Sequence, residues 1–317
     1  LPLVDGGPRK LVHGVFGTLM RGEAALPEKT TLPPKVAARW KKAWGQDMLT
    51  HAARALAQQP PTDVSLRDAS ETDALTTDLN GTSLMSGHVR LGDGPGVTDR
   101  PGFAEGRWWV QDIAASLPAR IAGGGSGRAL DLCAAPGGKT LQLAAAGWDV
   151  TALDISESRL GRLADNLERT GLSAKAVTAD ALDWKPDESF DLVLLDAPCS
   201  ATGIFRRHPD VLHRVHPRLI DEMAALQERL LARAADWVRP GGLLVYATCS
   251  LEPAEGEAQI ERFTAARDDF AIDPVLADEL PDGAFADKTG WLRTLPGMLE
   301  GEGGMDGFFI CRMMRTR

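Results

Sequence analysis

Downstream of a glycine-rich joint at residues 123–125, short apolar segments alternate with longer segments of helical periodicity. The apolar segments span 129–132, 150–153, 176–178, 192–195, 243–247 and 308–311, and the helical segments span 140–146, 156–170, 217–238 and 254–266. Strands that alternate with helices in this way form a parallel sheet with helices on both faces. The pattern therefore predicts an α/β fold with a doubly wound, mostly parallel sheet.

The chain upstream of this pattern is organised differently. Apolar residues at helical spacing, interrupted by Pro27 and by Pro33-Pro34, predict a helical extension over residues 1–59. Short polar and apolar alternation with glycine-rich turns then predicts a small α+β module over residues 60–115, for which we expect a role in RNA binding. The α/β domain is assigned to residues 116–317.

Composition excludes several classes of protein. The four cysteines, at positions 133, 199, 249 and 311, form no C-x-x-C pair, so neither a zinc ribbon nor a dense disulfide framework is expected, and no metal site is predicted. No apolar run approaches the roughly 18 residues of a membrane span, which predicts a cytoplasmic protein without membrane contact. The net charge of −9 argues against indiscriminate binding to polyanions but leaves room for a local basic patch.

Residues 131–140 read Asp-Leu-Cys-Ala-Ala-Pro-Gly-Gly-Lys-Thr. They leave a predicted strand, form a turn that contains glycine and enter a predicted helix, which is where a doubly wound sheet binds its ligand. The turn lacks G-x-G-x-x-G, and because Cys133 occupies the position of the first P-loop glycine it is not G-x-x-x-x-G-K-T either. A nucleoside triphosphate is therefore disfavoured.

Three acids, Asp154, Asp180 and Asp196, stand at or just beyond the ends of the next three predicted strands. The first is placed to accept hydrogen bonds from both ribose hydroxyls of an adenosyl ligand. Negative charge around one crevice disfavours pyrophosphate and suits a ligand with a sulfonium and an amino group, such as S-adenosylmethionine. The alternative for any one of these aspartates is a purely structural role at the start of a turn.

Two cysteines follow neighbouring predicted strands, Cys199 in Asp-Ala-Pro-Cys and Cys249 in Thr-Cys-Ser. Carbon 5 of a pyrimidine accepts a methyl group only after a nucleophile such as a thiolate has added to carbon 6. Enzymes that methylate an exocyclic amine instead need an aromatic residue after Asp/Asn-Pro-Pro, in the slot that Cys199 occupies. Either cysteine alone could be a small buried hydrophobic residue, but the pair favours carbon-5 chemistry.

These motifs together resemble the NOL1/NOP2/Sun family of RNA cytosine-5 methyltransferases. The resembling segments are 131–140, 196–203 with 206–210, and 246–250 followed by Glu255 and Glu257, while segments 106–112 and 305–309 agree with them. The chain is most similar to the branch that methylates bacterial small-subunit ribosomal RNA, in which a NusB-like helical domain precedes the small module. Residues 10–20 are similar to the last helix of that domain, and we expect most of the domain to be missing.

The resemblance implies a Rossmann-like class I methyltransferase domain with a seven-stranded sheet and S-adenosylmethionine as cofactor. It implies that Cys249 adds to carbon 6, that Asp196 with Lys139 holds the base edge and stabilises charge, and that Cys199 helps to release the product. In DNA cytosine-5 methyltransferases the Pro-Cys thiol attacks, and by that logic Cys199 and Cys249 exchange roles. The residues that the resemblance assigns to the cofactor are Cys133, Ala134, Ala135, Pro136, Gly137, Gly138, Lys139, Asp154, Asp180 and Asp196.

A target base must be unstacked to reach a thiol, so the predicted substrate is unfolded or unassembled 16S ribosomal RNA, bound by a monomer. Arg206, Arg207, His208 and Arg214 follow the Pro-Cys loop and are predicted to bind this RNA. One alternative is a transfer RNA cytosine-5 methyltransferase. Another is a non-catalytic RNA-binding ribosome assembly factor, against which the retained lysine, aspartate and cysteines of the site speak.

Overall fold

The computed structural model describes residues 7–22 and 30–317, so the predicted break at Pro27 lies outside the described residues. The helices are α1 Gly7–Arg21, α2 Pro34–Ala57, α3 Thr72–Asp78, α4 Ile113–Ile121, α5 Gly138–Ala145, α6 Glu157–Thr170, α7 Val211–Arg214, α8 Pro217–Asp236 and α9 Glu257–Ala266. The strands are β1 Asp63–Leu66, β2 His88–Arg90, β3 Trp108–Val110, β4 Arg128–Leu132, β5 Asp149–Asp154, β6 Lys175–Thr178, β7 Phe190–Asp196, β8 Val238–Thr248, β9 Phe270–Ile272, β10 Leu292–Arg293 and β11 Phe309–Arg315.

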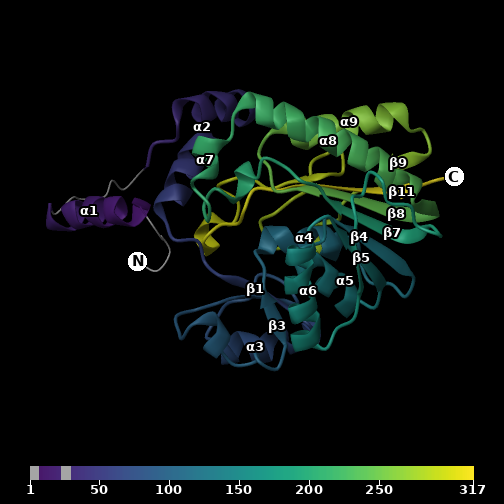
Figure 1. Cartoon of the computed structure of the whole chain (residues 1–317), viewed down its shortest axis with the longest axis horizontal. Coiled ribbons are helices and arrows are strands. Elements are labelled where there is room, and N and C mark those ends of the chain that lie inside the picture. The colour runs from purple at the N-terminus through teal and green to yellow at the C-terminus, as the bar shows by residue number, and fades with distance from the viewer. Residues whose placement is uncertain (1–6, 23–29) are drawn as a thin grey trace.

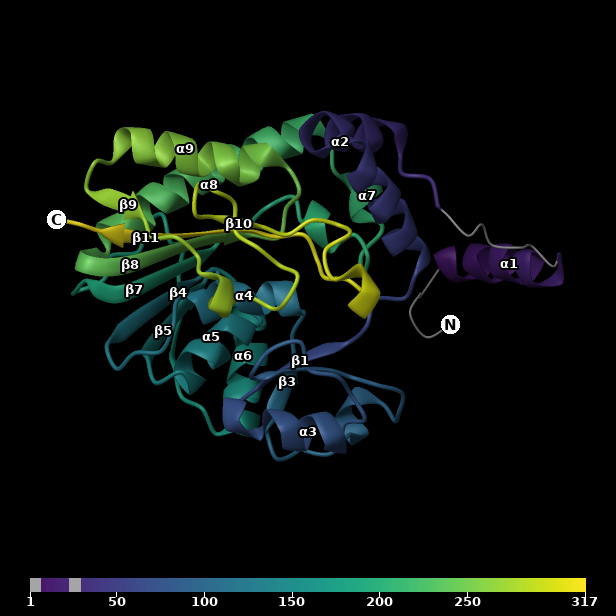
Figure 2. The same ribbon diagram turned by 180° about the vertical axis from the view of Figure 1, so that it is seen from behind.

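The large sheet has the order β10-β11-β8-β7-β4-β5-β6, and β9 pairs with β11 beside this path. The five strands from β8 to β6 are parallel, and β11 runs antiparallel to β8. The α/β class and the mostly parallel sheet are thus confirmed. Six of its strands correspond to the predicted apolar segments, and the resemblance implied a sheet of seven. Among the described residues this sheet has eight strands, since β10 and β9 pair with the first and second halves of the same edge of β11 (Figure 2).

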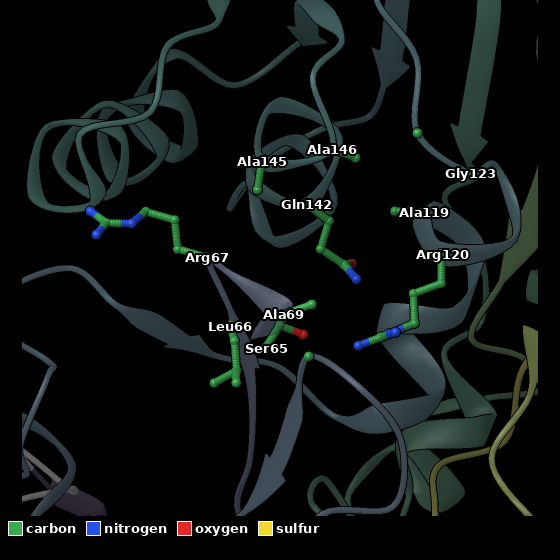
Figure 3. A pocket seen from close by; sticks show the side chains of 12 residues that line it. Ser65, Leu66, Arg67, Ala69, Ala119, Arg120, Gly123, Gln142, Ala145 and Ala146 are labelled. Atoms are coloured by element: carbon green, nitrogen blue, oxygen red, sulfur yellow. The ribbon is translucent and has the colours of Figure 1, made fainter. Parts of the chain in front are cut away.

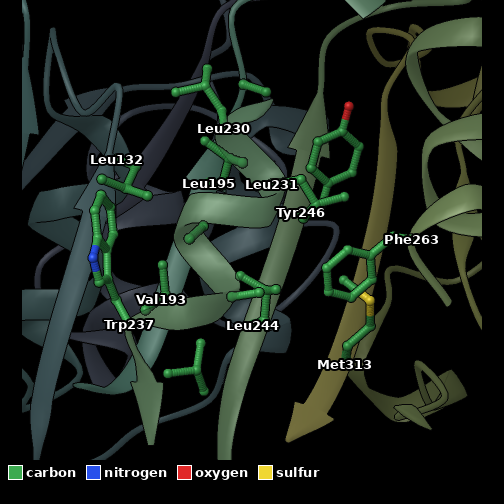
Figure 4. Packing of buried hydrophobic residues seen from close by; sticks show 14 of the residues in the cluster. Leu132, Val193, Leu195, Leu230, Leu231, Trp237, Leu244, Tyr246, Phe263 and Met313 are labelled. Atoms are coloured by element: carbon green, nitrogen blue, oxygen red, sulfur yellow. The ribbon is translucent and has the colours of Figure 1, made fainter. Parts of the chain in front are cut away.

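Helices cover both faces of this sheet, with α8 and α9 on one face and α4, α5 and α6 on the other (Figure 1). Figure 4 shows the first interface, where Leu230 and Leu231 of α8 and Phe263 of α9 pack against Leu195 and Tyr246. All five side chains are at most 7% exposed. A sheet covered in this way leaves its loops at the carboxyl ends of the parallel strands as the place for a ligand.

Local sequence explains where the helices begin. The Ser156 side chain accepts a hydrogen bond from the backbone N–H of Arg159 and caps α6. His216 caps α8 in the same way, and Pro217 stands at the first helical position, where its missing N–H costs nothing. The Asp112 side chain caps α4 by accepting from the backbone N–H of Ala114.

The small module is a three-stranded antiparallel sheet, β2-β1-β3, with α3 packed against it. The sequence placed its boundary with the α/β domain between residues 115 and 116, but α4 runs continuously across that point. Ile113 and Leu117 of this helix are fully buried in the core of the α/β domain. The whole of α4, from its N-cap Asp112 onward, therefore packs with the α/β domain, and the predicted boundary would cut this helix.

Helix α2 is bent at Gly45, whose φ of +85° is outside the helical range. Its Trp40 is fully buried against Phe205, with ring centroids 5.4 Å apart. The Arg39 guanidinium and the Trp40 indole N–H also donate to the carboxylate of Glu252, three residues after Cys249. The predicted helical extension is therefore attached directly to a loop of the α/β domain.

Candidate active site

Two cavities meet at the carboxyl ends of the parallel strands, and Cys133 lines both of them. The first has a volume of about 260 Å³ and the second of about 230 Å³. The predicted cofactor residues are divided between them: Cys133, Asp154 and Asp180 line the first, and Cys133, Ala134, Ala135, Pro136, Gly138, Lys139 and Asp196 line the second. The structure therefore brings nine of the ten predicted residues to one crevice.

The tenth, Gly137, lines neither cavity but shapes the turn. Its φ is +108°, and an added Cβ would lie 2.4 Å from the Leu163 side chain of α6, so a glycine lets helix and turn approach closely. Beneath the turn, the Thr140 hydroxyl donates to Asp131 Oδ2 at 2.6 Å. Among the described residues Asp131 Oδ1 has no partner, and burial raises the pKa of this carboxyl to about 7. An orphaned carboxyl oxygen in the wall of the second cavity suits a hydrogen-bonding ligand group such as an amine.

The first cavity has the features of an adenosyl site. Asp154 accepts hydrogen bonds from the backbone N–H groups of Ala135 and Ser156, which fixes its carboxylate at the end of β5. Each carboxylate oxygen has a second lone pair, so Asp154 and Asp180 can still accept from ribose hydroxyls. Ile155, 68% exposed, presents an apolar surface beside them. The residues present thus fit the predicted cofactor.

Lys139 and Asp196 form an ion pair in the second cavity, with Nζ 2.7 Å from Oδ2. Burial alone would lower the pKa of Lys139, but the charge and hydrogen bond of Asp196 outweigh it, so this pKa lies above its usual value. The ammonium also lies 5.5 Å from the ring centroid of Phe308. The crevice therefore contains a fixed cation whose position two neighbours define.

Cys199 and Cys249 lie next to each other, with their sulfur atoms 3.4 Å apart. Both follow the carboxyl ends of adjacent parallel strands, β7 and β8, as the sequence predicted. The hydrogen bond to Cys249 and then burial raise the pKa of the Cys199 thiol well above its ordinary value. In contrast, Cys311 is fully buried in β11, and burial raises its pKa to about 12.

Glu255, which sequence reasoning did not assign a role, connects the two cysteine loops. Its fully buried carboxylate accepts from the backbone N–H of Ser200 at 2.8 Å, from the Ser250 hydroxyl at 2.5 Å and from Gln227 at 3.1 Å, and the Ser200 hydroxyl donates to it as well. Ser200 and Ser250 are the residues that follow the two cysteines. One carboxylate thus holds both loops in register, a role that no sequence spacing reveals.

Glu255→Ala is expected to lower the free energy of unfolding by about 4 kcal/mol, because four buried donors lose their acceptor and each unsatisfied donor costs at least about 1 kcal/mol. Glu261→Ala, at an exposed position on α9, is the matched control and should change stability by less than about 0.5 kcal/mol. Urea denaturation measures both values. Equal midpoints for the two variants would show that the carboxylate does not hold the loops.

The four predicted RNA-binding residues have different environments. Arg206 is buried, with a side chain only 4% exposed, and pairs with Asp306 and Asp112, so it stabilises the interior and does not present a surface to RNA. Arg207 is 26% exposed and pairs with the same two carboxylates. His208 and Arg214 are exposed, and they remain candidates for RNA contact.

The carboxylates that pair with Arg206 and Arg207 come from two segments far away in the sequence. Asp112 and Asp306 belong to the segments 106–112 and 305–309 that agree with the family pattern, and the structure joins them through Arg206 and Arg207. Burial and the charge of Asp112 raise the pKa of Asp306 to about 6 despite the arginines. The motifs indicated that both segments belong to the family pattern, but they did not predict the ion pairs with Arg206 and Arg207.

Comparison with known proteins decides the family. Residues 124–314 match the sequence model of a family described as 16S rRNA methyltransferase RsmB/F. The chain belongs to this family. The resemblance identified from the motifs is thereby confirmed, and S-adenosylmethionine is the cofactor.

Individual relatives of this RsmB/F chain agree. The ribosomal RNA small subunit methyltransferase B of Salmonella arizonae is 42% identical over 233 residues, which cover 72% of this chain and 51% of that protein. The protein of the same description from Klebsiella pneumoniae subsp. pneumoniae is 37% identical over 328 residues, covering 97% of this chain and 73% of the relative. The crystal structure of the protein PH0851 superposes with a TM-score of 0.80 at 25% identity, covering 96% of this chain and 73% of that one.

The RsmB/F chain therefore spans only part of these relatives, about half of the Salmonella protein. In residues 7–22 and 30–317 no helix is long and apolar enough to cross a membrane. The same residues contain no group of three or more histidine, cysteine, aspartate or glutamate side chains that could hold a metal ion.

Proposed function

We propose that this chain transfers a methyl group from S-adenosylmethionine to carbon 5 of a cytosine in RNA, acting in the cytoplasm as a monomer on unfolded or unassembled 16S ribosomal RNA. The observation that carries the proposal is the contact between Cys199 and Cys249, with sulfur atoms 3.4 Å apart beside the Lys139–Asp196 pair. Methyl transfer to oxygen or nitrogen needs no such thiol pair, whereas carbon 5 requires a nucleophile.

When bound, the cofactor supplies an electrophilic methyl group. The sulfur of Cys249 adds to carbon 6 of the cytosine and makes carbon 5 electron-rich. Lys139 and Asp196, fixed 2.7 Å apart, are placed to bind the polar edge of the base and to stabilise the charge that develops during addition. Carbon 5 then takes the methyl group while the base is held to Cys249.

Release of the product needs an elimination in which a base takes the proton from carbon 5 and the sulfur of Cys249 leaves carbon 6 as a thiolate. We assign assistance in this step to Cys199, because its sulfur touches that of Cys249. We assign the attack to Cys249 because the family resemblance places the nucleophile in the Thr-Cys-Ser segment, which directly follows β8. The contact between the two sulfur atoms is the same for the exchanged roles of the DNA enzymes, so single variants of the two cysteines are needed to distinguish them.

The proposal is tested by incubating the protein with methyl-labelled S-adenosylmethionine and, separately, with unfolded 16S ribosomal RNA, assembled small subunits and transfer RNA. Bisulfite sequencing then maps 5-methylcytosine. We expect label in a single cytosine position of unfolded 16S ribosomal RNA. Label only in transfer RNA would move the activity to that substrate, and label in none would favour a non-catalytic assembly factor.

A further inference from the structure

A third cavity, of about 240 Å³, lies between the small module and the α/β domain (Figure 3). Its walls are formed by the end of β1 and the residues after it, by the end of α4 and by the second half of α5. Two arginines, Arg67 and Arg120, line it, and no acidic side chain does. In a chain with a net charge of −9, this is a locally cationic hollow.

Arg120, near the end of α4, points its guanidinium into this cavity toward Ser65 and Gln142, whereas Arg67 points away from it (Figure 3). Within the described part of the chain, its guanidinium donates only to the carbonyl of Ser86, and its Nε has no partner. Burial lowers the pKa of Arg120, and no acidic neighbour compensates for this. The charge of Arg120 thus has no counter-ion among residues 7–22 and 30–317.

The most buried arginines among the described residues each pair with at least one carboxylate. Arg90 pairs with Asp63, Arg293 with Glu257, and Arg312 with Asp273 and Glu279. Arg206 likewise has two carboxylates. A cation that burial deprives of water needs such a partner. Arg120 is half-buried, and among the described residues it lacks a carboxylate, as do Arg169 and Arg233, which donate only to carbonyl and amide oxygens. Arg120 differs from these two because it lines this cavity, which points to a partner from outside the chain.

Two further groups shape the cavity for a ligand. Ser65 is 2% exposed, and its hydroxyl has no partner among the described residues. Gly87 lines the same cavity with φ at +71°, and an added Cβ would lie 2.8 Å from Arg120 Nη2. The glycine therefore keeps open the space that the guanidinium occupies, and an unused donor stands on the opposite wall.

We infer that this cavity binds a tetrahedral oxyanion of the phosphate class, with Arg120 and Ser65 as donors, and that the anion is a backbone phosphodiester of the RNA. The second part rests on the proposed function. An arginine guanidinium and a hydroxyl are the donor types that bind phosphate oxygens in nucleic-acid complexes. Gln142 of this cavity accepts a 2.7 Å hydrogen bond from Gln111, which lines the second cavity of the active site, so the two hollows share a wall.

The test compares Arg120→Met with Arg262→Met, which removes an equal charge from a half-exposed arginine on α9. Affinity for a fluorescent single-stranded RNA is measured by anisotropy between 50 and about 300 mM salt, a range in which phosphate contacts dominate the salt dependence. Loss of one phosphate contact should reduce the slope of log Kd against log salt by about 0.7 in Arg120→Met only. Ser65→Ala, which keeps every charge, should weaken binding about threefold.

A second measurement separates the two sources of the anion. Thermal unfolding in inorganic phosphate and in chloride at equal ionic strength should show a stabilisation by phosphate in the wild type that Arg120→Met loses. If phosphate distinguishes the variants but RNA does not, the site binds a free anion. If Arg120→Met matches Arg262→Met in both measurements, the inference is overturned.

Methyl transfer by the wild-type protein is measured in parallel. An inactive wild type would contradict the proposed function, whereas equal RNA binding by the two arginine variants with an active wild type would contradict only this inference. Circular dichroism and the binding of S-adenosylhomocysteine confirm that Arg120→Met is folded, since Arg120 also contacts Ser86.

Discussion

Cys249→Ala is expected to reduce methyl transfer by a factor on the order of 10⁴ or more, because without the sulfur carbon 5 of the base stays unreactive. Cofactor binding should be unchanged, since Cys249 lines neither of the two cavities assigned to S-adenosylmethionine. Single-turnover methylation and calorimetric titration with S-adenosylhomocysteine measure the two properties separately. A selective loss of the first would place Cys249 in the chemistry itself.

Cys311→Ala is the matched control for this variant. Cys311 lies opposite Tyr246 of β8 but is fully buried and faces no cavity of the site. Its replacement should cost about 1 kcal/mol of stability through a small void and leave the methylation rate within a few fold. Full turnover by Cys249→Ala would refute the assigned nucleophile, whatever the control does.

The Cys199→Ala variant should accumulate a covalent protein–RNA adduct that survives denaturing electrophoresis. Addition and methyl transfer do not need Cys199 in the proposed scheme, whereas elimination does, so the base remains attached to Cys249. The adduct should appear with S-adenosylmethionine present and should carry the transferred methyl group. In the wild type its steady-state amount should be several-fold lower, because elimination keeps pace with addition.

The double variant Cys199→Ala/Cys249→Ala provides the control, because it lacks both sulfur atoms of the pair and keeps only Cys133 in the crevice. The scheme would be contradicted if Cys249→Ala trapped RNA while Cys199→Ala lost all activity. That result would instead assign the attack to Cys199, as in the DNA enzymes. The two single variants therefore distinguish the alternatives without further assumptions.

Most of the α/β domain could be predicted from sequence because its strands are apolar segments that are followed by titratable or nucleophilic side chains. Asp196 ends β7, and Cys249 directly follows β8, as expected. Parallel strands present their carboxyl ends at one edge, so residues far apart in the chain had to meet there. The contact between Cys199 and Cys249 follows from this geometry together with the adjacency of β7 and β8.

What could not be predicted depends on pairing between distant segments. Arg206 looked like an RNA contact because it stands among basic residues, yet Asp306 and Asp112, far away in sequence, enclose it. No spacing in the sequence indicates the role of Glu255, because this role depends on hydrogen bonds from Ser200 and Ser250 in the two cysteine loops. The strands β9 and β10 were missed because three and two residues show no alternation, and only pairing with β11 makes them strands.

The antiparallel partner of β8 comes from far downstream, since β11 begins only at Phe309. During synthesis on the ribosome, the strand that leads to Cys249 emerges long before the segment that completes its hydrogen bonding. Until then β8 has a free edge, which is prone to pair with other chains. A nascent chain of this protein therefore gains its active centre late, and we expect premature termination before β11 to yield aggregates and no partially active enzyme.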